Sequence, residues 1–214
     1  MSKLVIIGAR AMGRETYAYA CECGTEVKGF LDSKTDALDG FNGYPPILNP
    51  VESYRPCDED VFVVALGEPE YKVRYAGIIA EKGGRFASVI HPTAYIGKNV
   101  KIGAGCIICP NATITNDTEV GEHVIVNIGA SVNHDNQIGD YSTICPGARL
   151  AGRVRIGRGV FVGTGALVIP DVQLGDNVLV AAGATVTKSF ERGRLMGVPA
   201  TMRCHDKDSA FHSR

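Results

Sequence analysis

An aliphatic side chain returns at every sixth position from Ile90 to Val186, and this period limits the possible folds of the chain more than any other feature. A period of six fits neither an α-helix, which repeats every 3.6 residues, nor a simple strand, which repeats every two. It fits short strands joined by tight turns in a β-solenoid, where three hexapeptides close one triangular coil. The segment therefore predicts just under six coils, stacked about 4.8 Å apart. The aliphatic column is Ile90, Ile96, Ile102, Ile108, Ile114, Val120, Val126, Val132, Ile138, Ile144, Leu150, Ile156, Val162, Val168, Leu174, Val180 and Val186.

This repeat resembles the left-handed parallel β-helix of the hexapeptide acyltransferases. The left-handedness is implied by that resemblance, because parallel crossovers are ordinarily right-handed. A solenoid that serves only as a scaffold is the alternative. It is the weaker one, since solenoids of this type usually build their active sites in grooves between neighbouring prisms.

The composition argues against several classes of protein. A formal net charge of −1, with 21% charged residues among 214, gives no basic field for nucleic acid or an anionic membrane. The longest apolar runs, such as Val61 to Leu66, are far too short to span a bilayer, and the amino terminus lacks the apolar region of a signal peptide. We therefore expect a cytoplasmic protein without membrane insertion.

The cysteines predict reduced thiols and no metal site. Seven is an odd number, and no secreted framework surrounds them. Cys106 and Cys109 form a C-x-x-C, but no second pair follows to complete a zinc site. Cys106 also lies in the column of small residues that precedes the aliphatic column by two places, so core filling is the better interpretation.

The amino-terminal segment reads as a βαβ unit. A buried strand over residues 3–7 runs into the turn Gly8 to Gly13 and a helix to about Cys23, and a second strand over residues 27–31 ends at Asp32. The helix amino terminus could hold a phosphate, and Asp32 could accept hydrogen bonds from a ribose or a base. Arg10 breaks the dinucleotide fingerprint G-x-G-x-x-G, so a mononucleotide or sugar nucleotide fits better than NAD. A turn acid without a ligand remains the alternative for Asp32.

Further along, residues 33–60 read as a connecting loop with at most short structure. A strand over residues 61–66, a helix over about 70–82 and a short strand over 86–90 lead into the coils. We therefore expect an α/β architecture in which a small Rossmann-like amino-terminal domain is followed by a left-handed parallel β-helix. The predicted parts are a sugar-nucleotide-binding domain (1–85), a β-helix acyltransferase domain with a carboxyl-terminal extension (86–204) and a flexible tail (205–214).

One hexapeptide, which begins at Val132, is far more polar than the others. It contains His134 and Asp135, and Asn136 alone breaks the rule of small residues. Polar groups on an aliphatic prism cost free energy unless they are bonded or used. Position 152, one coil above His134, is a glycine, so we expect space there for a ligand to pass. An imidazole can take a proton near neutral pH, and Asp135 could fix its tautomer. A surface histidine beside an unrelated acid is the alternative.

The other histidines fit a catalytic role less well. His91 is expected to cap the turn at the first coil, and His123 is expected to be exposed without an acid neighbour on its repeat. His205 and His212 belong to the predicted tail. No three histidines recur on adjacent coils, which disfavours a zinc site of the carbonic-anhydrase type.

Motifs over nearly the whole chain resemble the PglD/NeuD-type acetyltransferases. They are the turn Gly8 to Gly13, the entry Ile90 to Ala94, the element Asn133 to Asp135, and the exit Gly197 to Ala200. The resemblance implies transfer of an acetyl group from acetyl-CoA to the amine of a nucleotide-linked amino-deoxysugar, or, in the NeuD branch, to a sialic-acid hydroxyl.

The same resemblance implies roles for individual residues. His134 becomes the general base and Asp135 its orienting carboxylate. Acetyl-CoA contacts, made largely by backbone groups, fall near Thr143, Gly152, Thr164 and Ala182. Contacts to the acceptor fall on Arg10, Ala11, Met12, Asp32, Ser33 and Gly67, and the asparagine seven residues before the base is Asn127. The family loop often reads G-A-G-G-H-G, and Arg10, Ala11 and Met12 depart from it, so we expect the acceptor or its nucleotide to be held differently.

We expect direct transfer, in which His134 removes a proton from the attacking sugar amine and no acyl-enzyme is needed. Prism faces that expose valine and isoleucine between glycine turns predict a homotrimer. Two rivals from other classes remain. A nucleotidyltransferase would need a longer, more basic amino-terminal domain, whereas a non-catalytic sugar-nucleotide sensor would need no base.

Overall fold

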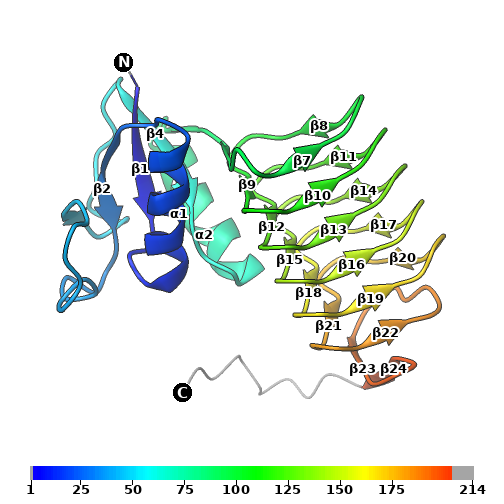
Figure 1. Ribbon diagram of the computed structural model, residues 1–214. Helices are drawn as coiled ribbons and strands as arrows, with labels where there is room; N and C mark the ends of the chain where they lie inside the picture. Colours follow the sequence, from blue (N-terminus) through cyan, green and yellow to red (C-terminus); the bar gives the residue numbers. More distant parts are fainter. Residues whose placement is uncertain (1, 204–214) are drawn as a thin grey trace.

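The computed structural model describes residues 2–203, in an α/β domain followed by a triangular β-prism (Figure 1). The first domain contains a parallel sheet of five strands in the order β3-β2-β1-β4-β5, with two helices. The strands are β1 (Lys3–Ile7), β2 (Val27–Leu31), β3 (Ile47–Asn49), β4 (Asp60–Val64) and β5 (Arg85–Phe86), and the helices are α1 (Ala11–Glu22) and α2 (Pro69–Glu81).

The two faces of this sheet bury alternate residues of β1. Leu4 and Ile6 pack with α1, whereas Val5 and Ile7 pack with α2. This alternation is what a strand covered on both sides requires. The α1 side of the sheet also packs against Ile107 and Ile125 of the prism, so the two domains share one apolar core.

Seventeen strands of two residues form the prism, and every third strand belongs to the same face. We call the face that the amino-terminal domain covers the docked face. Its strands are β6 (Val89–Ile90), β9 (Ile107–Ile108), β12 (Ile125–Val126), β15 (Thr143–Ile144), β18 (Phe161–Val162) and β21 (Leu179–Val180), followed by β23 (Arg194–Met196) and β24 (Thr201–Arg203).

The other two faces alternate with the docked face along the chain. The second face contains β7 (Tyr95–Ile96), β10 (Thr113–Ile114), β13 (Ser131–Val132), β16 (Arg149–Leu150), β19 (Leu167–Val168) and β22 (Thr185–Val186). The third face contains β8 (Lys101–Ile102), β11 (Glu119–Val120), β14 (Gln137–Ile138), β17 (Arg155–Ile156) and β20 (Gln173–Leu174). Partner strands lie 18 residues apart, as in the pair Ile114 and Val132, which confirms the predicted coil length.

Most of the aliphatic column points into the prism and is fully buried, together with the small residues two places before it. Cys106 and Cys109 are both buried, in agreement with core filling. Within residues 2–203, no set of three histidine, cysteine or acidic side chains is placed to hold a metal ion. Neither helix in that range is long and apolar enough to cross a bilayer.

The predicted elements of the first domain agree with the structure to within one or two residues, with one error. The segment 86–90 was expected to be a single strand. It is divided between β5, which closes the first sheet beside β4, and β6, which opens the docked face beside β9. The chain changes sheets between Phe86 and Val89. The tail predicted over residues 205–214 lies outside the described residues.

A buried lysine joins the two domains. Lys72 of α2 is 0% exposed, and its Nζ donates to the carbonyl oxygens of His123 and Ser142, at 3.1 and 2.9 Å, and to Oγ1 of Thr143 at 2.8 Å. Thr143 Oγ1 in turn donates to the carbonyl oxygen of Gly67 at 2.6 Å. Burial lowers the pKa of Lys72 to about 7, whereas the three acceptors favour its protonated form. These bonds fix the segment after β4 against β15, the fourth strand of the docked face.

Candidate active site

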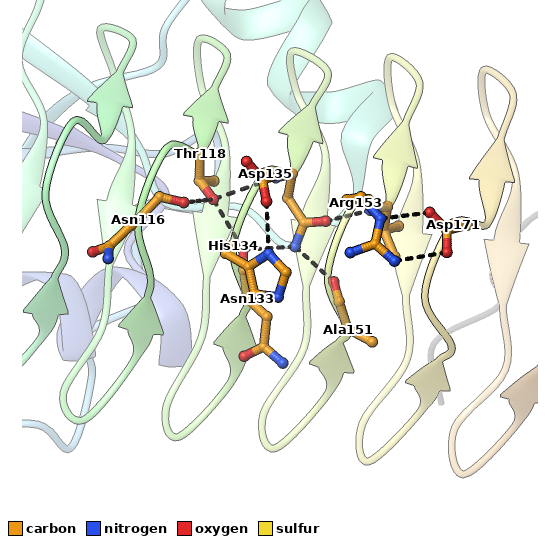
Figure 2. Close-up of polar contacts among 10 residues, drawn as sticks. Asn116, Thr118, Asn133, His134, Asp135, Ala151, Arg153 and Asp171 are labelled. Carbon is orange, nitrogen blue, oxygen red and sulfur yellow. Dashed lines mark hydrogen bonds and ion pairs between the residues drawn. The ribbon is translucent and has the colours of Figure 1, made fainter.

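His134 and Asp135 form a hydrogen-bonded pair at the corner between the second and third faces (Figure 2). Nδ1 of His134 lies 2.7 Å from Oδ2 of Asp135, and the two side chains are 53% and 54% exposed. A carboxylate can only accept, so Nδ1 carries the proton and Nε2 keeps its lone pair. The pair therefore has the arrangement of an oriented general base that faces solvent.

The turn geometry explains why these two residues adopt this position. Asp135 has a φ of 59°, which places it in the left-handed region. Aspartate and asparagine tolerate that region better than most residues, and nine corner positions outside glycine adopt it among the described residues. Asp135 N also donates to the carbonyl oxygen of Asn116 one coil below, at 3.1 Å. The solenoid thus fixes the backbone of the pair on both sides.

The space expected above His134 is filled by the imidazole itself. A Cβ built on Gly152 would lie 2.5 Å from Cε1 and 2.7 Å from Nε2 of His134, so the ring rests directly on this glycine. The expectation of an open passage at position 152 was therefore wrong, because the ring leans toward the next coil. Gly152 makes room for the base rather than for a ligand at that point.

One of the polar residues in the hexapeptide that begins at Val132 has a structural role. Asn136 is buried, and its Nδ2 donates to the carbonyl oxygens of Asn133 and Ala151, at 2.9 and 3.0 Å. Its Oδ1 accepts from the backbone N of Val154, at 2.5 Å. Figure 2 shows this network running behind His134 from coil to coil. Asn136 is thus a bonded core residue that stiffens the corner carrying the base.

His123 is buried and not exposed, which corrects the sequence-based expectation. It is 4% exposed, stacks on Tyr141 at 4.9 Å between ring centroids and meets Phe86 edge-on at 4.5 Å. Burial, together with the charge of Lys72, lowers its pKa to about 4, so the imidazole is neutral. The amino-terminal domain covers it, since Phe86 belongs to β5.

His91 also lies at the domain joint, where Nε2 meets Oε2 of Glu22 and Nδ1 accepts from Thr93 N, which is the expected cap of the turn.

The predicted acceptor residues of the first domain lie together at the carboxyl end of its sheet. Arg10 is the N-cap of α1 without a capping hydrogen bond from its side chain, and Ala11 and Met12 open the helix. Asp32 accepts from the backbone N atoms of Ala9 and Lys34, both at 2.9 Å. Ser33 is exposed beside it, and Gly67 follows β4 at the same edge. Asp32 therefore braces the glycine turn itself.

The residues expected near acetyl-CoA are not brought together within one chain. Thr164 and Ala182 are exposed on adjacent coils at the corner between the docked and second faces, and Asn127, which was expected to contact the acceptor, lies below them. Gly152 lies instead at the His134 corner. Thr143 is buried in the domain joint, where its hydroxyl is bonded to Lys72 and Gly67. Lys72 was missed by the sequence analysis, because nothing local distinguishes it from an exposed helical lysine.

Two family models match the chain, one in each domain. Residues 3–77 match the PglD N-terminal domain, and residues 87–116 and 153–188 match the bacterial transferase hexapeptide (six repeats). No curated protein matches the sequence.

Solved structures are similar over nearly the whole chain. The acetyltransferase domain of PglB from Neisseria gonorrhoeae FA1090 is 28% identical, with 95% of this chain and 100% of that chain covered and a TM-score of 0.88. PerB from Caulobacter crescentus, solved with CoA and GDP-perosamine, is 27% identical, with 95% and 98% covered and a TM-score of 0.87. WeeI from Acinetobacter baumannii AYE is 28% identical, with 95% and 100% covered and a TM-score of 0.84.

The prism and the two family models define a left-handed hexapeptide-repeat transferase with a small α/β domain at its amino terminus. More particularly, the two family models and the similar solved structures together support a PglD-type hexapeptide-repeat sugar acetyltransferase. The comparisons support an acetyltransferase over the nucleotidyltransferase and the non-catalytic sensor that the sequence left open.

Proposed function

We propose that this acetyltransferase moves the acetyl group of acetyl-CoA to the amine of a nucleotide-linked amino-deoxysugar, with His134 as the general base. The observation that carries the proposal is the bond from Nδ1 of the half-exposed His134 to Asp135, which leaves Nε2 of the same ring to accept a proton. The similar Caulobacter protein was solved with CoA and GDP-perosamine, and the Neisseria domain with acetyl coenzyme A.

The proposed chemistry is one displacement at the thioester. The amine nitrogen attacks the carbonyl carbon, Nε2 of His134 takes the proton that the nitrogen loses, and a backbone N–H stabilises the oxyanion. Collapse of the tetrahedral intermediate breaks the carbon–sulfur bond and forms the amide. The imidazolium then returns its proton to the departing CoA thiolate, so that no acyl-enzyme forms. Asp135 stabilises the imidazolium while it exists.

The position of the acylated atom can be tested on the product. We expect mass spectrometry to show one acetyl group on the nucleotide-linked sugar, and we expect that group to survive mild alkali, because amides resist hydrolysis that removes esters. Loss of the group in alkali would instead support transfer to a hydroxyl, as in the sialic-acid O-acetyltransferase alternative.

The amino-terminal domain is proposed to bind the acceptor. Replacing Asp32 by alanine removes the bond from Ala9 N, which braces the glycine turn, and the bond from Lys34 N in the loop after β2; each such bond to a charged group is worth about 1.5–3 kcal/mol. We expect the acceptor KM to rise roughly tenfold or more, with the acetyl-CoA KM nearly unchanged. Asp36→Ala, an exposed acid in the same loop, is the matched control. Equal increases in both KM values would show that the domain has been assigned wrongly.

One chain cannot complete the proposed site, because its two halves lie on opposite sides of the prism. The acceptor residues belong to the domain on the docked face, whereas His134 lies at the corner opposite that face. A hexapeptide side of six extended residues spans roughly 20 Å, so the width of the prism separates them. Thr164 and Ala182 lie at a third location, the corner between the docked and second faces. A neighbouring copy that brings its own corner to His134 would close the site.

We therefore expect a homotrimer in solution. Light scattering should give about three times the 22.7 kDa of the monomer. Mixed trimers made from His134→Asn chains and Asp32→Ala chains should recover part of the lost activity, since some sites then combine an intact base with an intact acceptor domain. A monomer that keeps full activity on dilution would contradict the shared site.

A further inference from the structure

The corner that carries His134 also carries a column of charged side chains in a fixed register (Figure 2). Arg153 lies one coil beyond Asp135, and Asp171 lies one coil beyond Arg153, each 18 residues along the chain. All three occupy the same left-handed turn position, with φ of 59°, 59° and 66°. Because adjacent coils lie about 4.8 Å apart, the guanidinium of Arg153 has a carboxylate within reach on either side.

Arg153 binds only one of these two carboxylates. Its Nε donates to Oδ1 of Asp171 at 2.7 Å and its Nη2 donates to Oδ2 at 2.9 Å, a bidentate pair. Asp135 instead accepts from Nδ1 of His134. The hydrogen bond and charge of Asp171 raise the pKa of Arg153, and the charge of Asp135 adds to this effect, so that both carboxylates act on the same cation.

Whether Arg153 binds Asp171 or Asp135 affects how His134 can act as a base. A guanidinium on Asp135 would compete with Nδ1 of His134 for the carboxylate oxygens. It would also place a positive charge beside an imidazole that has to become positive during the reaction, which disfavours proton uptake. The pair with Asp171 prevents this, although as an exposed ion pair it contributes little to folding stability.

We propose that Asp171 is a positioning residue, which holds Arg153 away from Asp135 and so reserves that carboxylate for His134. The proposal rests on the proposed function of His134 as the general base.

Asp171→Ala should lower kcat roughly threefold to tenfold without a change in Tm, because it frees Arg153 to turn to Asp135. The double variant Arg153→Met/Asp171→Ala lacks the competing cation, and its kcat should return to within about twofold of the wild-type value. The loss in Asp171→Ala should shrink at about 1 M salt, where the Debye length is about 3 Å. Glu119→Ala, which frees Lys101 from an exposed pair on the third face, is the matched control and should leave kcat unchanged.

The nitrogen NMR signals of the His134 ring give a readout that does not depend on turnover. The wild-type ring should carry its proton on Nδ1, Asp171→Ala should shift the ring toward a mixture of tautomers, and the double variant should restore the wild-type pattern. An equal or greater loss of kcat in the double variant, or an unchanged ring in Asp171→Ala, would overturn the proposal. Absence of acetyl transfer by the wild-type protein would overturn the proposed function instead, and the NMR result would still decide how Arg153 is held.

Discussion

Replacing His134 by asparagine should lower kcat by roughly 10²- to 10⁴-fold, the usual contribution of a general base. Asparagine keeps much of the size and some of the hydrogen bonding of histidine, but it cannot take the proton from the amine. The oligomer and the acetyl-CoA KM should persist, since neither depends on that proton. Steady-state kinetics with saturating acetyl-CoA measures the loss.

Two further measurements distinguish the loss of the general base from a structural change at the corner that carries it. Asp135→Asn should cost less than His134→Asn, because it weakens and misorients the base without removing it. The rise of kcat/KM with pH should also flatten in His134→Asn, unless ionisation of the acceptor amine alone sets that rise. If His134→Asn kept more than about a third of the wild-type kcat, the assignment of the base would be wrong.

Adding a single methyl group at Gly152 should have the second largest effect. The new Cβ would lie 2.5 Å from Cε1 of His134, which is closer than atoms can approach, so the imidazole must move. We expect kcat to fall roughly tenfold to a hundredfold in Gly152→Ala, since displacements of about 1 Å can have effects of this size. The backbone itself accepts alanine, because Gly152 does not have a positive φ.

Gly77→Ala is the control for this change. Gly77 lies in α2 with open space around its Cβ position, and alanine favours a helix by about 1 kcal/mol. Its kcat should match the wild type and its Tm should not fall. A Gly152→Ala variant with a raised acetyl-CoA KM but an unchanged kcat would show that Gly152 serves the CoA and not the base.

The repeating part of the chain could be predicted from sequence because a period of six admits one kind of packing. Ile114 and Val132 lie in register as the column requires, and the strands of the first domain follow their apolar runs closely. The pairing of His134 with Asp135 was also accessible, since neighbours at a tight turn have few other partners.

Contacts between distant segments could not be predicted. His123 and Lys72 are buried only because the amino-terminal domain lies on the docked face. The sequence of a single coil does not predict which of its faces another domain covers. Asn136 looked like part of a reactive site, whereas its amide satisfies three backbone groups on two coils. The direction in which the ring of His134 leans also depends on side-chain packing. A glycine at position 152 permits this direction, but a glycine in the sequence does not predict it.

The proposed activity is the acetylation of a nucleotide-linked amino sugar at its amine. It is tested most directly by thiol release from acetyl-CoA, measured with a panel of UDP-, GDP- and dTDP-linked amino sugars and with free sialic acid. We expect at least one nucleotide-linked amine to give rapid release that the His134→Asn variant loses. Release with sialic acid alone, or release that His134→Asn retains in full, would contradict the account.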